Sequence, residues 1–416
     1  MTAPILAAAT LCFLVTSVHV TSIVIAICRF RRSPRHSALA EQCPPVSLVR
    51  PLCGIDNYAV DTLRSTFDLD YPLYEILFCV ASANDPVLPL VRRLMDEHAG
   101  VCAKLLIGDE RISLNPKLNN VLKGWHAAAH QWIIIADSNV LMTRDYIQLL
   151  FASWREDTGL VASPPIGCRP AGIWAELECA FLNTYQARWQ YVVDTLGYGF
   201  AQGKTMLWRR TDLDGAGGIE ALAKEVAEDA AATKVVRDAG LKVRLIDRPL
   251  AQPLGRRSLA EVWNRQLRWA RLRRASFLPY FLPEILSGGV VPMIGVAILA
   301  HAFALPMALC VATFGALWYG CEMVLAAAAG WHLPALYPLY GLLRDLLLPA
   351  LFFGALKGND FVWRGNEMQV ERMRPRRMMA HMQPRRVMAR MRPRVQEVAA
   401  GSRRRFRSLR QRLSER

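Results

Sequence analysis

Several short motifs that define common enzyme classes are absent from this 416-residue sequence. It has no Gly-x-Gly-x-x-Gly fingerprint and no P-loop, which argues against a dinucleotide-dependent dehydrogenase and against a P-loop kinase. The 10 cysteines include no Cys-x-x-Cys pair, and the 8 histidines show no metal-ligand spacing. We therefore predict neither disulfides nor a zinc site.

Charge is missing from the N-terminal segment. Residues 3–28 carry no Lys, Arg, Asp or Glu, and they are long enough to cross a bilayer of about 30 Å. A cleaved signal peptide is the alternative, but no basic residue precedes the apolar run, and four arginines follow it between positions 29 and 35. We predict a retained anchor over 1–28 whose N-terminus lies outside, with the next region in the cytosol.

A second apolar region follows near the C-terminus. It contains two good spans, about 285–305 and 307–329, and a third apolar stretch interrupted by Arg344 and Asp345. Two adjacent charges are costly in lipid, so this stretch is either interfacial, re-entrant, or a span whose charges pair within the protein. We assign 277–370 to a C-terminal membrane region and expect the chain to return to the cytosol after it.

Most of the excess positive charge is confined to the last segment. Residues 371–416 hold 16 Arg and 3 Glu, which gives +13 of the formal +16, and they repeat a Met-x-Pro-Arg motif every nine residues. Recurring proline argues against a continuous helix, so a disordered tail is predicted. Beside a bilayer such a tail is expected on anionic lipid headgroups, or to have no dedicated role, rather than on nucleic acid.

The middle of the chain alternates apolar strands with helices, which predicts an α/β domain over 29–276. Two of the strands end in a carboxylate. The run 132–136 leads into Asp137, and the run 75–80 leads into Asp85. Ligands of open α/β sheets bind at strand carboxyl ends, and Mg²⁺ takes one or two protein carboxylates together with substrate phosphates. The alternatives are a helix cap at Asp137 and a simple Asn-Asp-Pro turn at Asp85.

Two further features are ambiguous by themselves. In a helix, Arg265, Arg268 and Trp269 share one face, which suits either a pyrophosphate and a sugar ring or an anionic membrane surface. Asp229 lies in an alanine-rich stretch, where an acidic side chain ordinarily marks a solvated face or a first-turn charge.

Taken together, these segments resemble the ceramide glucosyltransferases, the lipid-directed inverting members of the GT-A class, over about residues 45–275. The match is carried by the following segments: 46–54, 69–72, 79–86, 115–120, Asp137-Ser138, 227–229 and 265–269. The resemblance implies a GT-A-type mixed sheet that binds a UDP-sugar, flanked by the N-terminal transmembrane helix and the C-terminal helical membrane region.

The resemblance also implies the role of each candidate residue. Asp137 binds Mg²⁺ or Mn²⁺, Asp229 is the catalytic base, and Asp85 holds the nucleotide. Arg265, Arg268 and Trp269 lie at the pyrophosphate and the acceptor entrance. Lys117 contacts phosphate or sugar, although Pro116 before it could simply start a helix.

The chain departs from the animal members of this family at two places. Asn139 follows Asp137-Ser138 where they carry Gly, and Gln186-Ala187 stands where they carry a His-Pro pair. This favours a bacterial relative in an inner membrane. We predict glucose transfer from UDP-glucose to ceramide. Diacylglycerol or hopanoid acceptors, and a non-catalytic membrane scaffold, are the alternatives.

Overall fold

The computed structural model describes residues 3–31, 38–363 and 366–369. The predicted basic tail and its repeat lie outside these residues. The strands are β1 Val46–Leu52, β2 Tyr74–Val80, β3 Cys102–Ile107, β4 Trp132–Ala136, β5 Thr158–Ala162, β6 Pro165–Ala171, β7 Thr205–Arg209, β8 Lys242–Leu245, β9 Leu250–Arg256, β10 Asp360–Trp363 and β11 Asn366–Gln369.

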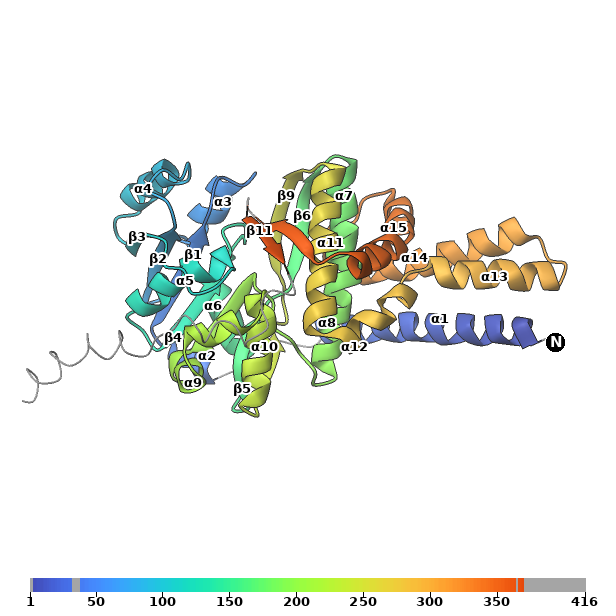
Figure 1. Cartoon of the computed structure of the whole chain (residues 1–416), viewed down its shortest axis with the longest axis horizontal. Coiled ribbons are helices and arrows are strands. Elements are labelled where there is room, and N and C mark those ends of the chain that lie inside the picture. The colour runs from blue at the N-terminus through green and yellow to red at the C-terminus, as the bar shows by residue number, and fades with distance from the viewer. Residues whose placement is uncertain (1–2, 32–37, 364–365, 370–416) are drawn as a thin grey trace, which may run out of the picture. The chain divides into compact units, whose positions relative to one another are not determined.

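Helices separate most of these strands (Figure 1). The helices are α1 Ala3–Phe30, α2 Ala38–Gln42, α3 Ala59–Arg64, α4 Leu88–Glu97, α5 Pro116–Ala127, α6 Tyr146–Ala152, α7 Ile173–Ala180, α8 Arg188–Thr195, α9 Arg210–Gly215, α10 Glu228–Asp238, α11 Leu259–Ser276, α12 Leu278–Phe281, α13 Val290–Ala302, α14 Met307–Ala329 and α15 Tyr337–Lys357, with a π-helical turn η1 Phe181–Ala187 and two 3₁₀ turns, η2 Ile219–Lys224 and η3 Leu282–Leu286.

A seven-stranded mixed sheet forms the centre of the α/β region, in the order β3-β2-β1-β4-β7-β5-β8. β7 runs antiparallel to its neighbours β4 and β5, whereas the other pairs are parallel. This confirms the predicted α/β fold with a mixed sheet. The sequence did not predict β6 and β9, which pair parallel in a separate small sheet. Both contain Pro and Gly, which weaken the sequence signal of a strand.

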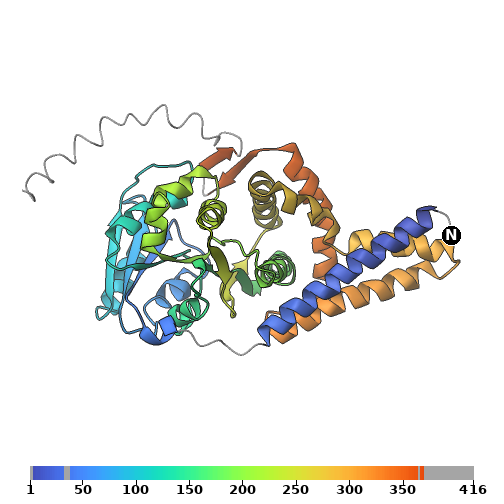
Figure 2. The same cartoon turned by 90° about the horizontal axis from the view of Figure 1, so that it is seen from below.

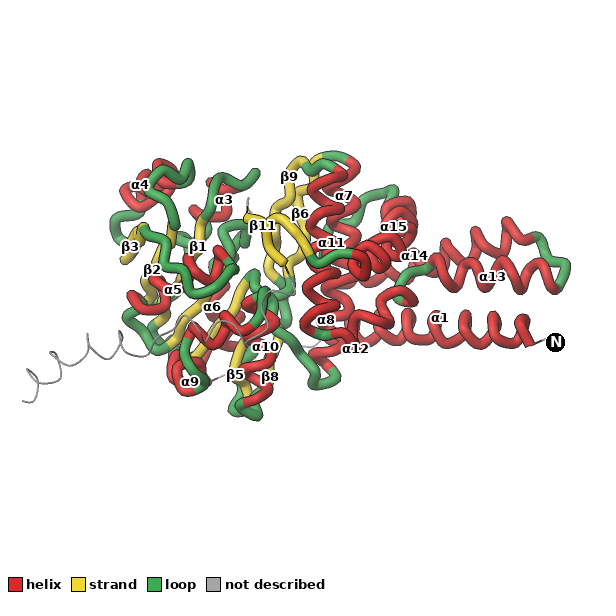
Figure 3. The backbone as a smooth tube through the Cα atoms, in the orientation of Figure 1, coloured by secondary structure: helices red, strands yellow, loops and turns green. Residues whose placement is uncertain are grey.

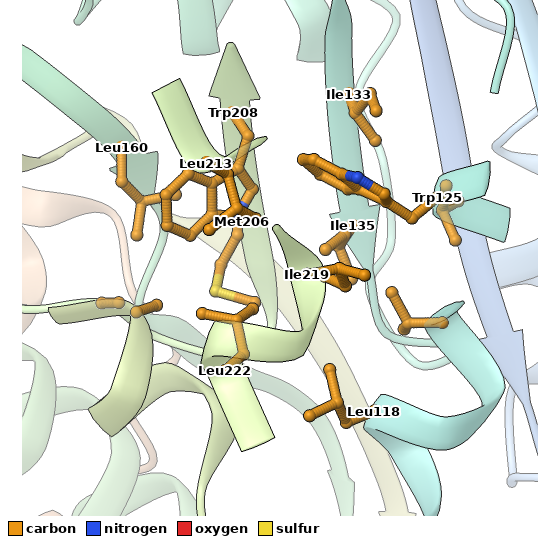
Figure 4. Close-up of a cluster of buried hydrophobic side chains, with 14 of the residues drawn as sticks. Leu118, Trp125, Ile133, Ile135, Leu160, Met206, Trp208, Leu213, Ile219 and Leu222 are labelled. Atoms are coloured by element: carbon orange, nitrogen blue, oxygen red, sulfur yellow. The ribbon is translucent and has the colours of Figure 1, made fainter. Parts of the chain in front are cut away.

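Apolar side chains cover both faces of the large sheet. On one face, α5, η2 and α10 pack against β4 and β7, and Figure 4 shows Trp125 and Trp208 among the aliphatic side chains of this cluster. On the other face, α6 places Tyr146, Ile147 and Leu150 against the sheet. Burial on both faces explains why these strands are near-continuous apolar runs and not alternating ones.

The carboxyl ends of the parallel strands meet at one edge of the sheet. There Asn120 of α5 donates hydrogen bonds to the carbonyl oxygens of Leu52 and Cys79, at 3.1 and 2.7 Å. These contacts hold the ends of β1 and β2 together, next to the loops that carry Gly54 and Asp85. This is the edge where the sequence places its candidate carboxylates.

In the part of the chain that the structure describes, four helical segments are long and apolar enough to cross a membrane: α1, α14, α15, and the run Leu278–Ala302, which contains α13. α1 packs against α13 and α14, as the two views in Figures 1 and 2 show, whereas α15 packs against α11 and α7. Figure 3 shows that, within the described residues, most strands gather on one side and the long apolar helices on the other.

The charges of the third C-terminal apolar stretch pair within the protein, which is one of the three predicted alternatives. Arg344 and Asp345 of α15 are buried and contact each other at 2.7 Å, and Arg344 also contacts Glu322 of α14 at 3.1 Å. A charged pair is thereby accommodated in an apolar helix without contact with lipid.

Candidate active site

Asp137 follows β4 directly, and both of its carboxylate oxygens contact lysine side chains. Oδ1 lies 2.6 Å from Nζ of Lys117, and Oδ2 lies 2.9 Å from Nζ of Lys204. Burial raises the pKa of Asp137, but the two ammonium groups lower it by more, so that this pKa lies well below its ordinary value. Asp137 is therefore an ionised carboxylate at the carboxyl edge of the sheet.

Lys117 joins this carboxylate to α10. Its Nζ lies 2.7 Å from Oε1 of Glu228 and also donates a hydrogen bond to the carbonyl of Gly203. Burial lowers the pKa of Lys117, and Asp137 and Glu228 raise it by more, so the ammonium group stays charged. One buried cation is thus shared by two carboxylates.

Asn115 sets the position of Lys117. Its Oδ1 accepts the backbone N–H groups of Lys117 and Leu118 at 2.9 and 3.2 Å, which caps α5. Its Nδ2 donates to Oε2 of Glu228 at 2.7 Å. The helix start at Pro116, which the sequence offered as the alternative to a binding role, is therefore present together with the contact between Lys117 and Asp137.

Asp229 is the second residue of α10 and is bound through backbone donors. Its Oδ2 accepts the N–H of Gly203 at 3.1 Å, and its Oδ1 accepts its neighbour Ala230 N–H at 2.8 Å. Burial and the adjacent Glu228 carboxylate raise the pKa of Asp229 to about 6, against the opposing effect of Lys117. Gly203 links the two sides of the site, because its carbonyl contacts Lys117 and its N–H contacts Asp229.

Asp85 organises two loops at the same edge. Its carboxylate accepts the N–H of Gly54 at 3.1 Å and the N–H of Val87 at 2.9 Å. Gly54 adopts a left-handed conformation with φ of 69°, which explains a glycine after β1. Asp85 therefore makes the turn that the sequence offered as its alternative role, and it remains half-buried at the sheet edge.

Arg265, Arg268 and Trp269 lie on α11, which begins with a capping box between Ser258 and Glu261. Arg265 contacts the buried carboxylate of Glu178 on α7 at 2.5 Å, and Trp269 packs against an apolar cluster that includes Ala175, Cys179, Leu182 and Leu254. Arg268 is half-buried on the same helix. Two members of the motif thus face α7.

Arg265 also acts on the carboxylate cluster. Burial lowers the pKa of Lys204, Asp137 raises it, and the positive charge of Arg265 lowers it further, so that the net shift is downward. Arg265 therefore lies within electrostatic range of Lys204. Together with Asp137, Lys117 and Asp229, these two residues form one site at the ends of β4 and β7 and on α5, α10 and α11.

The sequence missed Lys204, Gly203 and Glu178 as members of this site. Lys204 immediately precedes β7, the strand that runs antiparallel to β4, so only the pairing of β4 with β7 places it beside Asp137. Glu178 lies within a buried helix where nothing in the local pattern sets it apart. Glu228 was visible as half of an acidic pair, without an assigned role.

Asp137 can provide part of the coordination that a divalent cation needs. Among the residues that the structure describes, no group of three or more His, Cys, Asp or Glu side chains could hold a metal. A partly exposed, ionised carboxylate at a strand end nevertheless suits Mg²⁺ or Mn²⁺, which often take one protein oxygen and the rest from phosphates and water. The Lys204 ammonium now occupies the position of positive charge beside Oδ2.

The pattern of glycosyl transferase family 21 matches residues 14–375, a span that includes the whole site. The chain belongs to this family. This confirms the resemblance and shows that the protein is a glycosyltransferase of the hexosyltransferase type.

The family 21 assignment agrees with individual relatives. Ceramide glucosyltransferase 1 of Caenorhabditis elegans is 27% identical over 341 residues, which cover 79% of this chain and 72% of that protein. The ceramide glucosyltransferase of Komagataella phaffii is 40% identical over 103 residues, 24% of this chain and 20% of that one. A solved mannosyltransferase from Pyrobaculum calidifontis, in complex with GDP-Man and Mn²⁺, is 16% identical with a TM-score of 0.49, and the match covers 82% of this chain and 99% of that one.

Proposed function

We propose that this family 21 member transfers glucose from UDP-glucose to the primary hydroxyl of a ceramide-type membrane lipid, with inversion at the anomeric carbon. The observation that carries the proposal is the pair of unlike carboxylates. Asp137 is held ionised by two lysines, whereas Asp229 is half-buried with a pKa raised to about 6. One suits a cationic phosphate site and the other suits a base that works near neutral pH.

Asp229 is the proposed base. In an inverting transfer the acceptor hydroxyl attacks the anomeric carbon from the face opposite the departing diphosphate, and a carboxylate beside that hydroxyl takes its proton. The backbone N–H groups of Gly203 and Ala230 orient the Asp229 carboxylate. A pKa of about 6 keeps it ionised and basic at neutral pH.

Positive groups around Asp137 would bind the diphosphate. Lys117, Lys204 and Arg265 come from three different elements and converge on this edge of the sheet. A Mg²⁺ or Mn²⁺ ion held at Asp137 would add charge neutralisation on the leaving diphosphate. Asp85 would position the nucleotide through the two loops that it joins, and Arg268 and Trp269 would line the entrance from α11.

The membrane helices support a lipid acceptor. The four candidate spans lie in the same compact unit as the sheet, and two relatives that match this chain bear the name ceramide glucosyltransferase. With the N-terminus outside, as its flanking arginines favour, the site would lie on the cytosolic side, where UDP-sugars are available.

The test is UDP release and product mass in membranes containing the full chain. UDP-glucose, UDP-galactose and UDP-N-acetylglucosamine are each combined with ceramide, diacylglycerol and a hopanoid, with and without Mg²⁺ or Mn²⁺. Metal-dependent glucosylceramide is the expected main product. Glycosyl-diacylglycerol or hopanoid products would replace ceramide as the acceptor, and no turnover with any pair would refute the proposal in favour of a scaffold.

A further inference from the structure

A narrow crevice lies where the π-helical turn η1 meets α11, α12 and α15. Phe181 and Tyr185 of η1, Phe281 at the end of α12, and Leu351 of α15 give it apolar walls. Its interior volume is about 10 Å³, roughly the space of one water molecule. A crevice of this size can admit a single polar atom such as a carbonyl oxygen, while longer chains would lie along its apolar mouth.

One buried side-chain amide that lines this crevice has a nitrogen without a hydrogen-bond partner among the described residues. Gln186 of η1 donates through Nε2 to Oε1 of Gln266 on α11 at 2.8 Å. Gln266 is 2% exposed, and its own Nε2 has no hydrogen-bond acceptor among the described residues. Because a buried donor without a partner is unfavourable, this N–H group is suited to an oxygen atom that arrives with a ligand.

The charged residues of the crevice are already paired with each other. Arg273 of α11 makes a two-point contact with Glu284 of η3, at 2.6 and 2.8 Å. Tyr185 shares a hydrogen bond of 2.7 Å with Ser287. These pairs leave the Gln266 amide as the polar group of the crevice that a neutral ligand would meet, and they make the crevice a poor site for a phosphate headgroup.

The crevice borders the candidate membrane helices, and α11, which lines it, also reaches the proposed active site. Part of its wall belongs to the candidate spans 278–302 and 337–357, which also carry exposed apolar side chains such as Leu282 and Phe353. At the end of α11, Ser276 contacts Glu225 at 3.3 Å, four residues before Asp229. The opposite part of the same helix carries Arg265, beside the phosphate-binding cluster.

The buried charges of the membrane region fix the shape of η1. Arg344 donates to the carbonyl of Ala180 at 3.3 Å and to Oγ1 of Thr184 at 3.2 Å. A π-helical turn frees backbone groups that need such partners, and such turns frequently occur at functional sites. The turn therefore presents Gln186 toward Gln266 from a supported backbone.

We propose that this crevice recognises the acceptor lipid, and that Nε2 of Gln266 donates a hydrogen bond to the carbonyl oxygen of an amide-linked lipid of the ceramide class. This inference rests on the proposed function and deepens it, because it names the group that recognises the acceptor. Gln186 holds the Gln266 amide in place, and the two lipid chains extend over the apolar surface of α12 and α15.

The first test replaces Gln266 with methionine, which keeps the length of the side chain and removes its donor. The expected result is a rise of about threefold to tenfold in the KM for ceramide, the range of one neutral hydrogen bond, with the KM for UDP-glucose unchanged. Asn264→Ala is the matched control, since Asn264 is an exposed amide on the same helix. Equal changes in both KM values, or none, would overturn the proposal.

A ceramide analogue with the carbonyl reduced to CH₂ makes this test specific to one atom. The wild-type enzyme should lose several-fold in kcat/KM when the carbonyl is removed, whereas the Gln266→Met variant should lose little more. The same loss in both proteins would contradict a hydrogen bond from Gln266 to that oxygen. Activity of the wild type on diacylglycerol equal to that on ceramide would also contradict recognition of the amide linkage.

A second readout does not depend on turnover. A photoactivatable ceramide with a diazirine near the amide should label residues 181–186 or 266–273 of the wild type. The Gln266→Met variant should be labelled more weakly by the same probe at equal protein concentration. Labelling confined to other parts of the chain would refute the proposal that the acceptor lipid binds in this crevice. If the wild type makes no glycolipid but is labelled in the crevice, the proposed function fails while the acceptor site stands.

Discussion

This protein has one cluster of charged side chains in the candidate active site, around Asp137, and another among the membrane helices, around Glu322. The two clusters differ in their access to solvent. In the candidate active site, the paired side chains around Asp137, which are those of Asp137, Lys117, Lys204 and Glu228, keep between 7% and 22% of their surface exposed. In the membrane-side cluster, the paired side chains keep 0% to 1%. The first can exchange its partners for a ligand, whereas the second is closed and serves to join helices.

In the membrane-side cluster, the carboxylates of Glu322 and Asp345 are paired with groups of the protein itself. Glu322 of α14 accepts from Arg188 at 3.4 Å, from Arg344 at 3.1 Å and from the Tyr337 hydroxyl at 2.6 Å. Asp345 accepts from Arg344 and from the backbone N–H of Gly289, at 2.7 and 2.6 Å. Two positive and two negative side chains thus connect α8, α14 and α15 without a net charge.

The active-site cluster is organised differently, because its charged groups are partly exposed and can also contact a ligand. Lys117 is shared by Asp137 and Glu228, and Lys204 contacts Asp137 from β7. Among the described residues, the hydrogen-bond donors to the Asp229 carboxylate are the backbone N–H groups of Gly203 and Ala230. Burial and the adjacent Glu228 carboxylate raise the pKa of Asp229, whereas the two lysines lower that of Asp137, and this asymmetry separates a base from a phosphate site.

Asp229→Asn should have the largest effect. It should remove most of the glycosyltransfer activity and leave the fold intact. General base catalysis contributes about 10²- to 10⁴-fold, so kcat should fall by that factor while the KM for UDP-glucose changes little. Product formation and thermal unfolding in detergent measure the two effects. An Asp229→Asn variant that retains more than a tenth of the activity would remove Asp229 from the role of base.

Glu322→Leu should have the opposite signature. It leaves Arg188 and Arg344 buried without their shared carboxylate, and breaking a buried pair costs about 3–5 kcal/mol of stability. Folded protein and thermal stability should drop steeply. Glu97→Ala is the matched control, because its exposed pair with Arg64 should contribute about 1 kcal/mol or less. A stable Glu322→Leu variant would show that the membrane-side cluster does not join the helices.

The sequence predicted the two clusters unequally. Asp137 and Asp85 were identifiable because apolar strands lead into them, and the pairing of Arg344 with Asp345 was one of three alternatives for an interrupted apolar stretch. Lys204, Glu178 and Glu322 gave no such signal. Their partners come from elements that only the sheet pairing and the helix packing bring together, over separations of 67, 87 and 22 residues for Asp137, Arg265 and Arg344. Local pattern indicates strand ends well and tertiary ion pairs poorly.

Gly203→Ala tests whether the active-site cluster depends on close approach of the backbone. A Cβ at this position would lie 2.7 Å from Oε1 of Glu228 and 3.1 Å from Nζ of Lys117, so both side chains must move. Displacing a positioned group by about 1 Å can lower the rate by up to about 10²-fold. Gly215→Ala is the matched control, since nothing lies within 4 Å of its Cβ. Equal activities of the two variants would mean that the contacts of Gly203 do not position the site.

The smallest expected effect is a pH dependence that separates the two carboxylates within the active site. Asp229 must be ionised to act as a base, and its pKa is raised to about 6, so kcat/KM should fall about tenfold per pH unit below that value. The pKa of Asp137 is lowered, so its ion pairs persist through this window, and the stability that they provide is lost only as pH falls well below the ordinary Asp pKa of about 3.9. Activity should therefore fall several-fold between pH 6 and pH 5 while the thermal stability that depends on Asp137 is retained, because the two groups titrate in separate ranges. Parallel loss of activity and stability over that interval would mean that unfolding, and not protonation of the base, limits the enzyme at low pH.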